Sequence, residues 1–287
     1  MVEKREDILL KSFSGLEGGV VASGSTCGVV TGGAFGLALM YDDLFQGGDT
    51  TNKEGVLSIV GEYSKWFKEN YGSTLCRERS GVDWHTTWGH LRYFLPGDKL
   101  GKCFWHISGA IRHLFDYQGK TLPPVDIGKK EIQSEPIHCA QAVLKGIRDR
   151  TGIGDPLLER LSFVFDGGVG LQGGVCGALA GAIMGISLQL GLNIRDISYF
   201  QTLKSFAIGH INLLLDKPLG QAESFGVGKE IVKRFREEAG ASECHAIMGK
   251  EFSGWTDFQE HISSSDKCTE LIELAITETS KAIKRLT

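Results

Sequence analysis

The sequence predicts an all-α protein made of two homologous helical units, related by pseudo-two-fold symmetry and packed through glycine-rich helices. The first observation is an internal repeat, because residues 165–185 match residues 16–36 without a gap. The second is helical spacing of apolar residues in several long stretches outside the repeat. The third is the scarcity of strand signals. Residues 161–165 carry the best one, and the equivalent residues 12–16 do not share it.

The repeat keeps glycine, valine and cysteine in one unbroken register. Cys27 aligns with Cys176, and Val20 aligns with Val169. Glycine alone could match by chance in a chain with 39 glycines, but the cysteine, the valine and the register make chance a poor explanation. The aligned glycines are Gly18 with Gly167, Gly19 with Gly168, Gly24 with Gly173, Gly28 with Gly177, Gly32 with Gly181 and Gly36 with Gly185.

Glycine recurs at every fourth position in the helix predicted over residues 27–41 and in its counterpart in the second copy. On a helix this spacing places the glycines in one stripe. Because glycine destabilises a helix, such a stripe indicates the close approach of another backbone. We therefore expect the two glycine helices to pack on one another across a pseudo-two-fold axis, or between subunits.

The chain divides into a diverged first unit (residues 1–120), a linker (121–136) and a second unit (137–287). Three of the six prolines lie in residues 117–136. Residues 195–225 have no counterpart in the first unit and are interpreted as an insertion with a helix of its own. The counterpart of the helix that begins at Cys139 would fall before Met1. Further helices are expected over residues 6–13, 52–70, 104–115, 229–239 and 271–286, the last with Asp266 as its N-cap.

Composition excludes several classes of function. A net charge of −4 with no basic stretch argues against nucleic acid as a partner. With 41% hydrophobic and 23% charged residues, the chain has the composition of a soluble globular protein with no membrane span. The first residues lack an apolar signal core, so we expect a cytoplasmic protein. Cysteines are kept reduced there, and a cysteine pattern then favours metal binding or redox catalysis.

The seven cysteines recur at equivalent places in the two units. Three cysteines of the second unit are each expected in the first turn of a helix, and the fourth follows a helix stop. A helix N-terminus favours the thiolate, which is both the nucleophile and the metal ligand. A lone cysteine is usually an apolar filler, but a set repeated twice favours function. The second-unit set is Cys139, Cys176, Cys268 and Cys244, and the first unit repeats the last three as Cys27, Cys103 and Cys76.

The spacing of the cysteines leaves the type of site open. No pair has the Cys-x-x-Cys spacing of thioredoxin-like or zinc-ribbon motifs, and Cys-x-x-Cys-His for haem attachment is absent. A site is therefore assembled from separate helices, and could be a disulfide pair, an iron–sulfur centre or a zinc site. Residues 168–173 read G-x-G-x-x-G, but the βαβ unit of a dinucleotide fold is missing around them.

Several motifs in order resemble a known family. These are His138-Cys139-Ala140-Gln141-Ala142-Val143, then Cys176-Gly177-Ala178-Leu179-Ala180-Gly181, then Cys244 and Cys268. Together they resemble the C_GCAxxG_C_C family of putative redox-active proteins, from about residue 138 to the C-terminus. The first unit resembles a diverged copy, since Cys27-Gly28-Val29-Val30-Thr31-Gly32 lacks the alanine and the first cysteine is missing. The resemblance implies a helical protein that is redox-active through its cysteines.

We hypothesise thiol-based redox chemistry, or electron transfer through an iron–sulfur centre, with an unidentified redox partner protein. Catalytic and metal-ligand candidates are Cys139, Cys176, Cys244 and Cys268, and further ligand candidates are Cys27, Cys76 and Cys103. Glycines leave backbone accessible to a cofactor, with Gly28, Gly32, Gly174, Gly177 and Gly181 as the candidates. The competing interpretation is a non-catalytic binding module whose thiols are structural or hold zinc. Whether the chain forms a homodimer is open.

Overall fold

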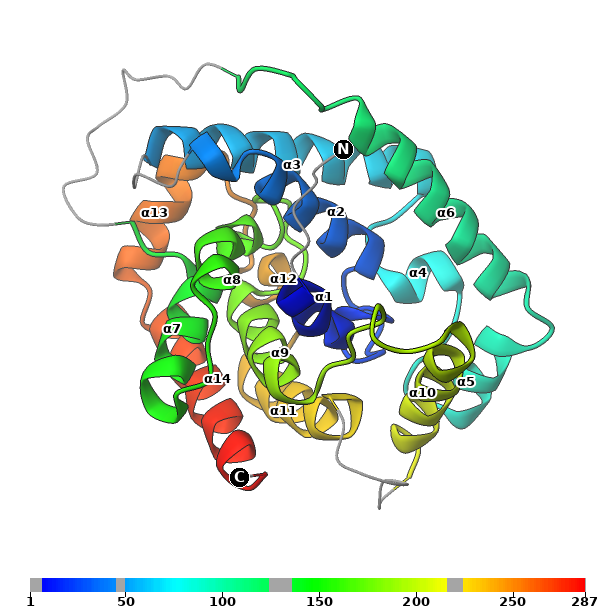
Figure 1. The fold of residues 1–287 in the computed structure, drawn as a ribbon. Coiled ribbons are helices and arrows are strands. Elements are labelled where there is room, and N and C mark those ends of the chain that lie inside the picture. The colour runs from blue at the N-terminus through cyan, green and yellow to red at the C-terminus, as the bar shows by residue number, and fades with distance from the viewer. Residues whose placement is uncertain (1–6, 45–49, 124–135, 216–223, 287) are drawn as a thin grey trace.

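A computed structural model describes residues 7–44, 50–123, 136–215 and 224–286 (Figure 1). Over these ranges the structure is helical and contains no β-strand, which confirms the predicted all-α class. Two isolated antiparallel bridges, Thr26 with Leu75 and Val175 with Glu243, are the only β-type pairs among the described residues. None of the described helices is both long enough and apolar enough to cross a bilayer.

The first unit begins with a short helix and a 3₁₀ turn, followed by a glycine-rich helix, a long helix and three further helices. The long helix α3 and the helix α6 lie along the edge of the molecule in Figure 1. The elements are α1 (Asp7–Phe13), η1 (Ser14–Leu16), α2 (Gly28–Met40), η2 (Asp42–Leu44), α3 (Thr50–Tyr71), α4 (Cys76–Ser80), α5 (Thr87–Phe94) and α6 (Asp98–Phe115).

The second unit repeats this order. Helix α8 with η3 corresponds to α1 with η1, and α9, α11, α12, α13 and α14 correspond to α2, α3, α4, α5 and α6. Helix α10 confirms the predicted insertion, and neither α10 nor α7 has a counterpart among the described residues of the first unit. The elements are α7 (Cys139–Thr151), α8 (Pro156–Leu161), η3 (Ser162–Phe165), α9 (Gly177–Leu190), α10 (Tyr199–Asn212), α11 (Ser224–Ala239), α12 (Cys244–Met248), α13 (Trp255–Ser264) and α14 (Asp266–Lys284).

Three local expectations are corrected. Residues 161–165 end helix α8 and form the 3₁₀ turn η3 instead of a strand, and all five side chains are buried. The mostly apolar run that suggested a buried strand therefore reflects burial alone. Cys103 does not begin a helix, because α6 starts at Asp98. Ser265, not Asp266, caps α14, since its hydroxyl accepts a hydrogen bond from the backbone N–H of Cys268 at 3.2 Å. Most of the predicted linker, residues 124–135, lies outside the described residues.

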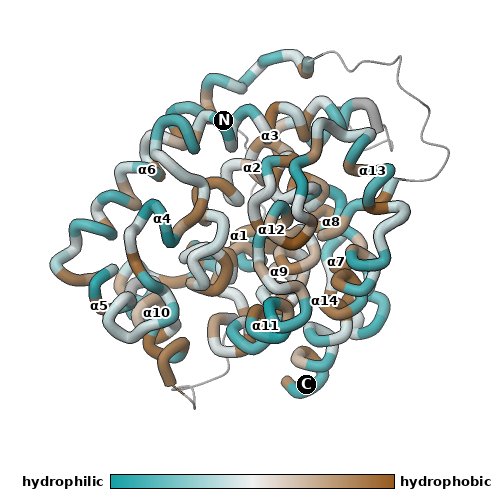
Figure 2. The backbone as a smooth tube through the Cα atoms, turned by 180° about the vertical axis from the view of Figure 1, so that it is seen from behind, coloured by the Kyte–Doolittle hydropathy of each residue, from teal (hydrophilic) through white to brown (hydrophobic). Residues whose placement is uncertain are grey.

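Helix α9 forms the centre of the molecule. Every residue from 177 to 188 is buried, and α7, α14, α11 and α1 pack around the helix. A helix that is apolar on all sides is stable in water only when it is enclosed in this way. Figure 2 shows the contrast, because the outer helices alternate between hydrophilic and hydrophobic residues while the central ones are mostly hydrophobic.

The glycine stripe of α9 receives helix α7, which corrects the expectation that the two glycine stripes pack on each other. A methyl group added at Gly181 would lie 2.9 Å from the carbonyl oxygen of Ala140 and 3.0 Å from Cβ of Val143. One added at Gly185 would lie 2.6 Å from Cδ1 of Ile147. These glycines therefore let α7 approach α9 at backbone distance, as the sequence implied for an unspecified partner.

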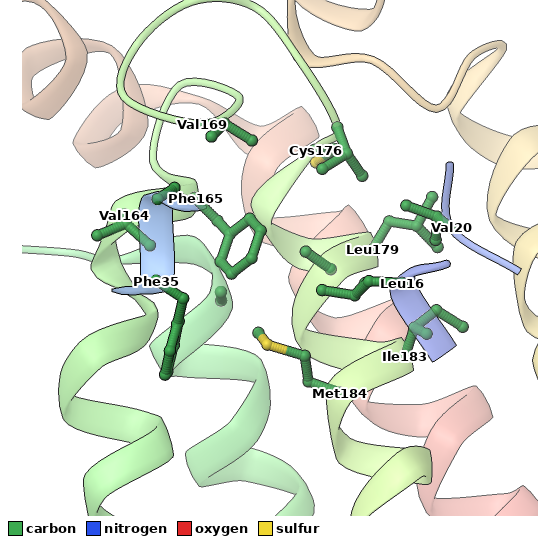
Figure 3. Packing of buried hydrophobic residues seen from close by; sticks show 14 of the residues in the cluster. Leu16, Val20, Phe35, Val164, Phe165, Val169, Cys176, Leu179, Ile183 and Met184 are labelled. Carbon is green, nitrogen blue, oxygen red and sulfur yellow. The ribbon is translucent and has the colours of Figure 1, made fainter. Parts of the chain in front are cut away.

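The two units contact each other reciprocally. Helix α1 and η1 of the first unit pack on α9, and α8 and η3 of the second unit pack on α2. Figure 3 shows both halves of this contact, with Leu16 and Val20 beside Leu179 and Ile183, and Phe35 beside Val164 and Phe165. Ion pairs also cross the boundary, among them Arg160 with Asp42 at 2.8 Å and Arg77 with Glu243 at 2.7 Å. A contact in which equivalent elements exchange roles has the form of a two-fold interface.

A left-handed helical turn precedes each glycine helix. Five consecutive residues have positive φ in each copy, residues 18–22 and 167–171. Left-handed backbone costs about 1–2 kcal/mol for each non-glycine residue, and Val20, Val21 and Ala22 all adopt it. Hydrogen bonds offset this cost, among them Val21 N–H to the carbonyl of Gly15 at 2.8 Å. Burial of all three side chains contributes as well.

The equivalent glycines Gly32 and Gly181 are predicted to respond to alanine in opposite directions. Gly181→Ala should destabilise the fold by about 1–3 kcal/mol, because its methyl group meets the backbone of α7. Gly32→Ala should stabilise it by up to about 1 kcal/mol, because alanine favours the helix and no described atom lies within 4 Å of the added methyl group. Urea unfolding of both variants measures the two changes, and the same sign in both would contradict this packing.

The left-handed turn is predicted to tolerate no side chain at Gly168. A Cβ there would lie 2.5 Å from the backbone nitrogen and oxygen of Gly174, and φ is +83°. Gly168→Ala should therefore cost about 3 kcal/mol or more in unfolding free energy. Gly119 is the control, because its φ is +75° but nothing lies within 4 Å of an added Cβ, so Gly119→Ala should cost only about 1 kcal/mol. Equal losses would show that the steric contact is unimportant.

Candidate functional site

Paired loop segments hold Cys176 and Cys244 next to each other. The N–H of Cys176 donates to the carbonyl of Ser242 at 2.8 Å, and the N–H of Cys244 donates to the carbonyl of Gly174 at 2.7 Å. Between them lies the bridge of Val175 with Glu243. The segment before α9 and the segment before α12 therefore run side by side, which sets the register of the two cysteines.

The first unit repeats this pairing. The N–H of Cys27 donates to the carbonyl of Thr74 at 2.8 Å, and that of Cys76 donates to the carbonyl of Ser25 at 2.7 Å. Thr26 and Leu75 form the bridge. Equal geometry in both copies shows that the duplicated sequence specifies this arrangement twice.

A buried carboxylate positions the start of α7. Asp166 follows η3 and is completely buried. Its Oδ1 accepts from the backbone N–H of Cys139 at 3.1 Å, and its Oδ2 lies 2.7 Å from Nδ1 of His138. Burial raises the pKa of Asp166, while His138 and the Cys139 N–H act in the opposite direction. Lys53 of α3 reaches the same group from the first unit, with its Nζ 3.4 Å from Nε2 of His138.

Thiols from four elements gather around one apolar cluster. Cys139 and Cys244 belong to it with Phe252, Phe258 and Ile262. Cys268 of α14 packs against this cluster and lies 3.7 Å from Sδ of Met248. Cys176 borders it from the main core, and negative charge on Cys176, Cys244 or Cys268 raises the pKa of Cys139. The structure thus brings the four predicted cysteines of the second unit into one neighbourhood, with Cys268 the least buried.

Burial outweighs the helix N-termini in setting the acidity of these thiols. The expectation of lowered pKa values is corrected, because desolvation raises the pKa of Cys139, Cys176, Cys244 and Cys268. For Cys176 the pKa rises to about 11, although the backbone N–H groups of Ala178 and Leu179 act in the other direction. The free energy lost when the thiolate charge is removed from water is larger here than the stabilisation that the two N–H groups give it.

An arginine lies among the thiols of the first unit. Nη1 of Arg79 donates to Sγ of Cys27 at 2.6 Å, and its guanidinium also contacts His106. Burial raises the pKa of Cys27, and the charge of Arg79 opposes that rise. Burial and the nearby Cys27 likewise raise the pKa of Cys76. In the second unit Ile247 takes the place of Arg79, so the two sites differ in charge.

Protein atoms occupy the space beside most of the predicted cofactor-binding glycines. A methyl group at Gly177 would lie 2.8 Å from Cβ of Cys139, and one at Gly174 would lie 2.7 Å from Oγ1 of Thr26. Gly181 faces α7, and Gly28 faces the carbonyl of Leu16. Only Gly32, among these five, has no neighbour within 4 Å. Gly174, Gly177 and Gly181 therefore serve close packing, whereas a methyl group at Gly28 would make only ordinary contact, at 3.5 Å from the carbonyl oxygen of Leu16.

Within the described ranges, no group of three or more His, Cys, Asp or Glu side chains is placed so that it could hold a metal ion. The described thiols form no such group as they are placed, and an iron–sulfur cluster or zinc ion here stays a prediction. All seven cysteines have free sulfurs.

The sequence does not predict three residues that contact the cysteines or their neighbours: Asp166, Lys53 and Arg79. A signal for Asp166 was present, since an acidic residue precedes Gly-Gly in both copies, as Glu17-Gly18-Gly19 and Asp166-Gly167-Gly168. Lys53 and Arg79 carry no such signal, because each acts on a residue far away in the sequence.

Comparison with protein families finds one match, to a model described as "Putative redox-active protein (C_GCAxxG_C_C)". The match covers residues 1–95 and 137–282, so both units contribute. Comparison with curated proteins and with solved structures finds no match. With most of the chain matched in two segments, each carrying the paired cysteine loops described above, the protein belongs to the C_GCAxxG_C_C family as a tandem of two units.

Proposed function

We propose that the second unit carries out thiol–disulfide exchange with a disulfide of a partner molecule, using Cys268 and Cys244. The observation that carries this proposal is the cluster that both residues share: Cys268 packs against it from α14, and Cys244 belongs to it from α12. Neither sulfur is already held in a disulfide, so both thiols are free to react.

Cys268 is the attacking thiol because it is the least buried of the four. Burial raises its pKa, and a hydrogen bond to Ser265 opposes part of that rise. After it loses its proton, the Cys268 thiolate attacks one sulfur of the partner disulfide. The S–S bond of the partner breaks, a mixed disulfide forms, and the other partner sulfur leaves as a thiolate.

Cys244 then resolves the mixed disulfide. Its thiolate attacks the sulfur of Cys268, the bond from Cys268 to the partner breaks, and the partner leaves with its second thiolate. The protein has lost two electrons and two protons, and the partner disulfide has gained them as two thiols. The high pKa of Cys244 suits a thiol that stays protonated until an intramolecular target is in reach.

Asp166 and His138 act as positioning residues for Cys139. Asp166 fixes the first N–H of α7, and the His138 ring contacts the rings of Phe163 and Trp255 in tilted arrangements, with centroids 5.8 Å and 5.4 Å away. Cys139 and Cys176 complete the set of thiols, and both are more deeply buried than Cys268. They are therefore available to exchange with an internal Cys244–Cys268 disulfide and not directly with a partner.

A small disulfide should reveal the Cys244–Cys268 pair. In anaerobic protein treated with one equivalent of 5,5′-dithiobis(2-nitrobenzoate), we expect two thionitrobenzoate ions per reacting site, because the mixed disulfide is resolved internally. Peptide mapping by mass spectrometry should then identify the Cys244–Cys268 disulfide. In Cys244→Ser the reaction should stop at a thionitrobenzoate adduct on Cys268, with one ion released.

Cys76→Ser is the matched control, because Cys76 holds the equivalent place in the first unit. It should leave the second-unit disulfide unchanged. Internal disulfide formation in Cys244→Ser to the same extent as in the unchanged protein would rule out the resolving role of Cys244.

Alkylation should report the raised thiol pKa of Cys176. With its pKa near 11, the thiolate fraction grows about tenfold per pH unit up to that value, whereas an unperturbed cysteine levels off above about pH 8.5. The iodoacetamide rate at Cys176, followed by mass spectrometry of native protein, should therefore still rise between pH 9 and pH 10. In urea-unfolded protein the rate should level off. A plateau below pH 9 in the native protein would contradict the effect of burial.

A further inference from the structure

Among the described residues of the first unit, no helix covers the face that α7 covers in the second unit. In the second unit α7 fills the space between α9 and α14. Positions 2, 5 and 9 of α7, which are Ala140, Val143 and Ile147, lie against the glycine stripe of α9. Position 8, Gly146, lies against Ile276 of α14, since an added Cβ would be 2.5 Å from Cδ1 of that residue.

The corresponding glycines of the first unit are open. Gly32 is exposed, and an atom added at Gly32 or Gly36 would have no neighbour within 4 Å. Glycine weakens a helix by about 1 kcal/mol relative to alanine. The open glycine stripe therefore destabilises α2, and no packing contact within the described molecule offsets this.

The corresponding side of α6 is apolar and exposed. Four large side chains follow one face of this helix at intervals of three and four residues. Ile111, which aligns with Ile276, is 50% exposed, whereas Ile276 under α7 is 7% exposed. Contiguous exposed apolar surface of this kind marks an interaction site. The open face consists of Gly32 and Gly36 of α2 with Phe104, Ile107, Ile111 and Phe115 of α6.

We propose that this open face binds an amphipathic α-helix of a partner protein, seated as α7 is seated in the second unit. The occupant carries small or β-branched apolar residues at its positions 2, 5 and 9, because these are the residue types that fit against glycines four apart. A second copy of this chain does not supply it, since its own α7 is already buried against α9 and α14.

The charged residues of α6 beside the open face distinguish the expected partner helix from α7 itself. In the second unit Arg150, at position 12 of α7, pairs with Glu273 at 2.7 Å and donates to Thr277 at 2.9 Å. The aligned residues of α6 are Ser108 and Arg112. An arginine at position 12 would meet a cation there, so the partner helix carries an acidic residue at that position.

The inference does not depend on the thiol chemistry proposed above. A cysteine at position 1 of the occupant would lie beside Gly28, as Cys139 lies beside Gly177, and would give the first unit its fourth thiol. The test uses peptides without a thiol so that docking and redox activity are measured separately.

The probes are two fluorescent peptides of residues 137–152 that carry Cys139→Ser, one of them also carrying Arg150→Glu. Fluorescence anisotropy with the full chain should show saturable 1:1 binding, about two- to fivefold tighter for the Arg150→Glu peptide. Gly32→Leu in the protein should weaken binding at least tenfold, because the leucine fills the place of the helix. Arg112→Glu should reverse the preference between the peptides.

Ser58→Leu is the matched control, because it adds the same side chain at an exposed position of α3. It should bind both peptides unchanged. Thermal unfolding verifies that Gly32→Leu remains folded, with a melting temperature that is not lowered. The proposal is overturned if neither peptide saturates, or if Gly32→Leu binds as the unchanged protein does. It is also overturned if the chain dimerises and Gly32→Leu abolishes the dimer, since the occupant would then be a second copy.

Discussion

The pairing of two loops by backbone hydrogen bonds is the constraint on which the site depends. The segment before the glycine helix bonds to the segment before the short cysteine-bearing helix, at Cys176 and Cys244 in one unit and at Cys27 and Cys76 in the other. The left-handed turn sends the chain in the direction that this pairing requires, since Gly168 and Gly174 of the same loop are joined by a 2.6 Å hydrogen bond. Backbone bonds keep their geometry whatever the side chains do, so the cysteines stay adjacent while their surroundings diverge.

Desolvation then determines how the thiols behave. The helix N-termini supply N–H groups, yet burial dominates and the thiols stay protonated near neutral pH. Cys268 is the most accessible of the four thiols, and for this reason the proposed exchange begins there. The electrostatic environment of the thiols differs in the first unit, because Arg79 places a positive charge against Cys27. One duplicated scaffold thus provides two electrostatic environments for the same loop.

Sequence patterns were sufficient for most of the helices and for the repeat, because these follow from apolar spacing and from a match within the chain. They were insufficient where the outcome depends on a distant element. The partner of the α9 stripe was α7 and not the twin helix, and glycine spacing reports a close approach without saying what approaches. The hydroxyl of Ser265 caps the backbone N–H of Cys268, and Arg79 contacts Cys27, which lies 52 residues away in the sequence. The positive φ angles of the valines could not be predicted from the sequence, since valine ordinarily avoids positive φ.

The reciprocal contact of α1 with α9 and of α8 with α2 has the symmetry of a homodimer in which each subunit lends its first helix to the other. Joining two such subunits in one polypeptide replaces a concentration-dependent equilibrium with an intramolecular one, whose effective concentration is on the order of millimolar. Substitutions that would separate free subunits are then tolerated. The second unit could therefore acquire α7 and α10, which have no counterpart among the described residues of the first unit, and the two halves would still remain associated.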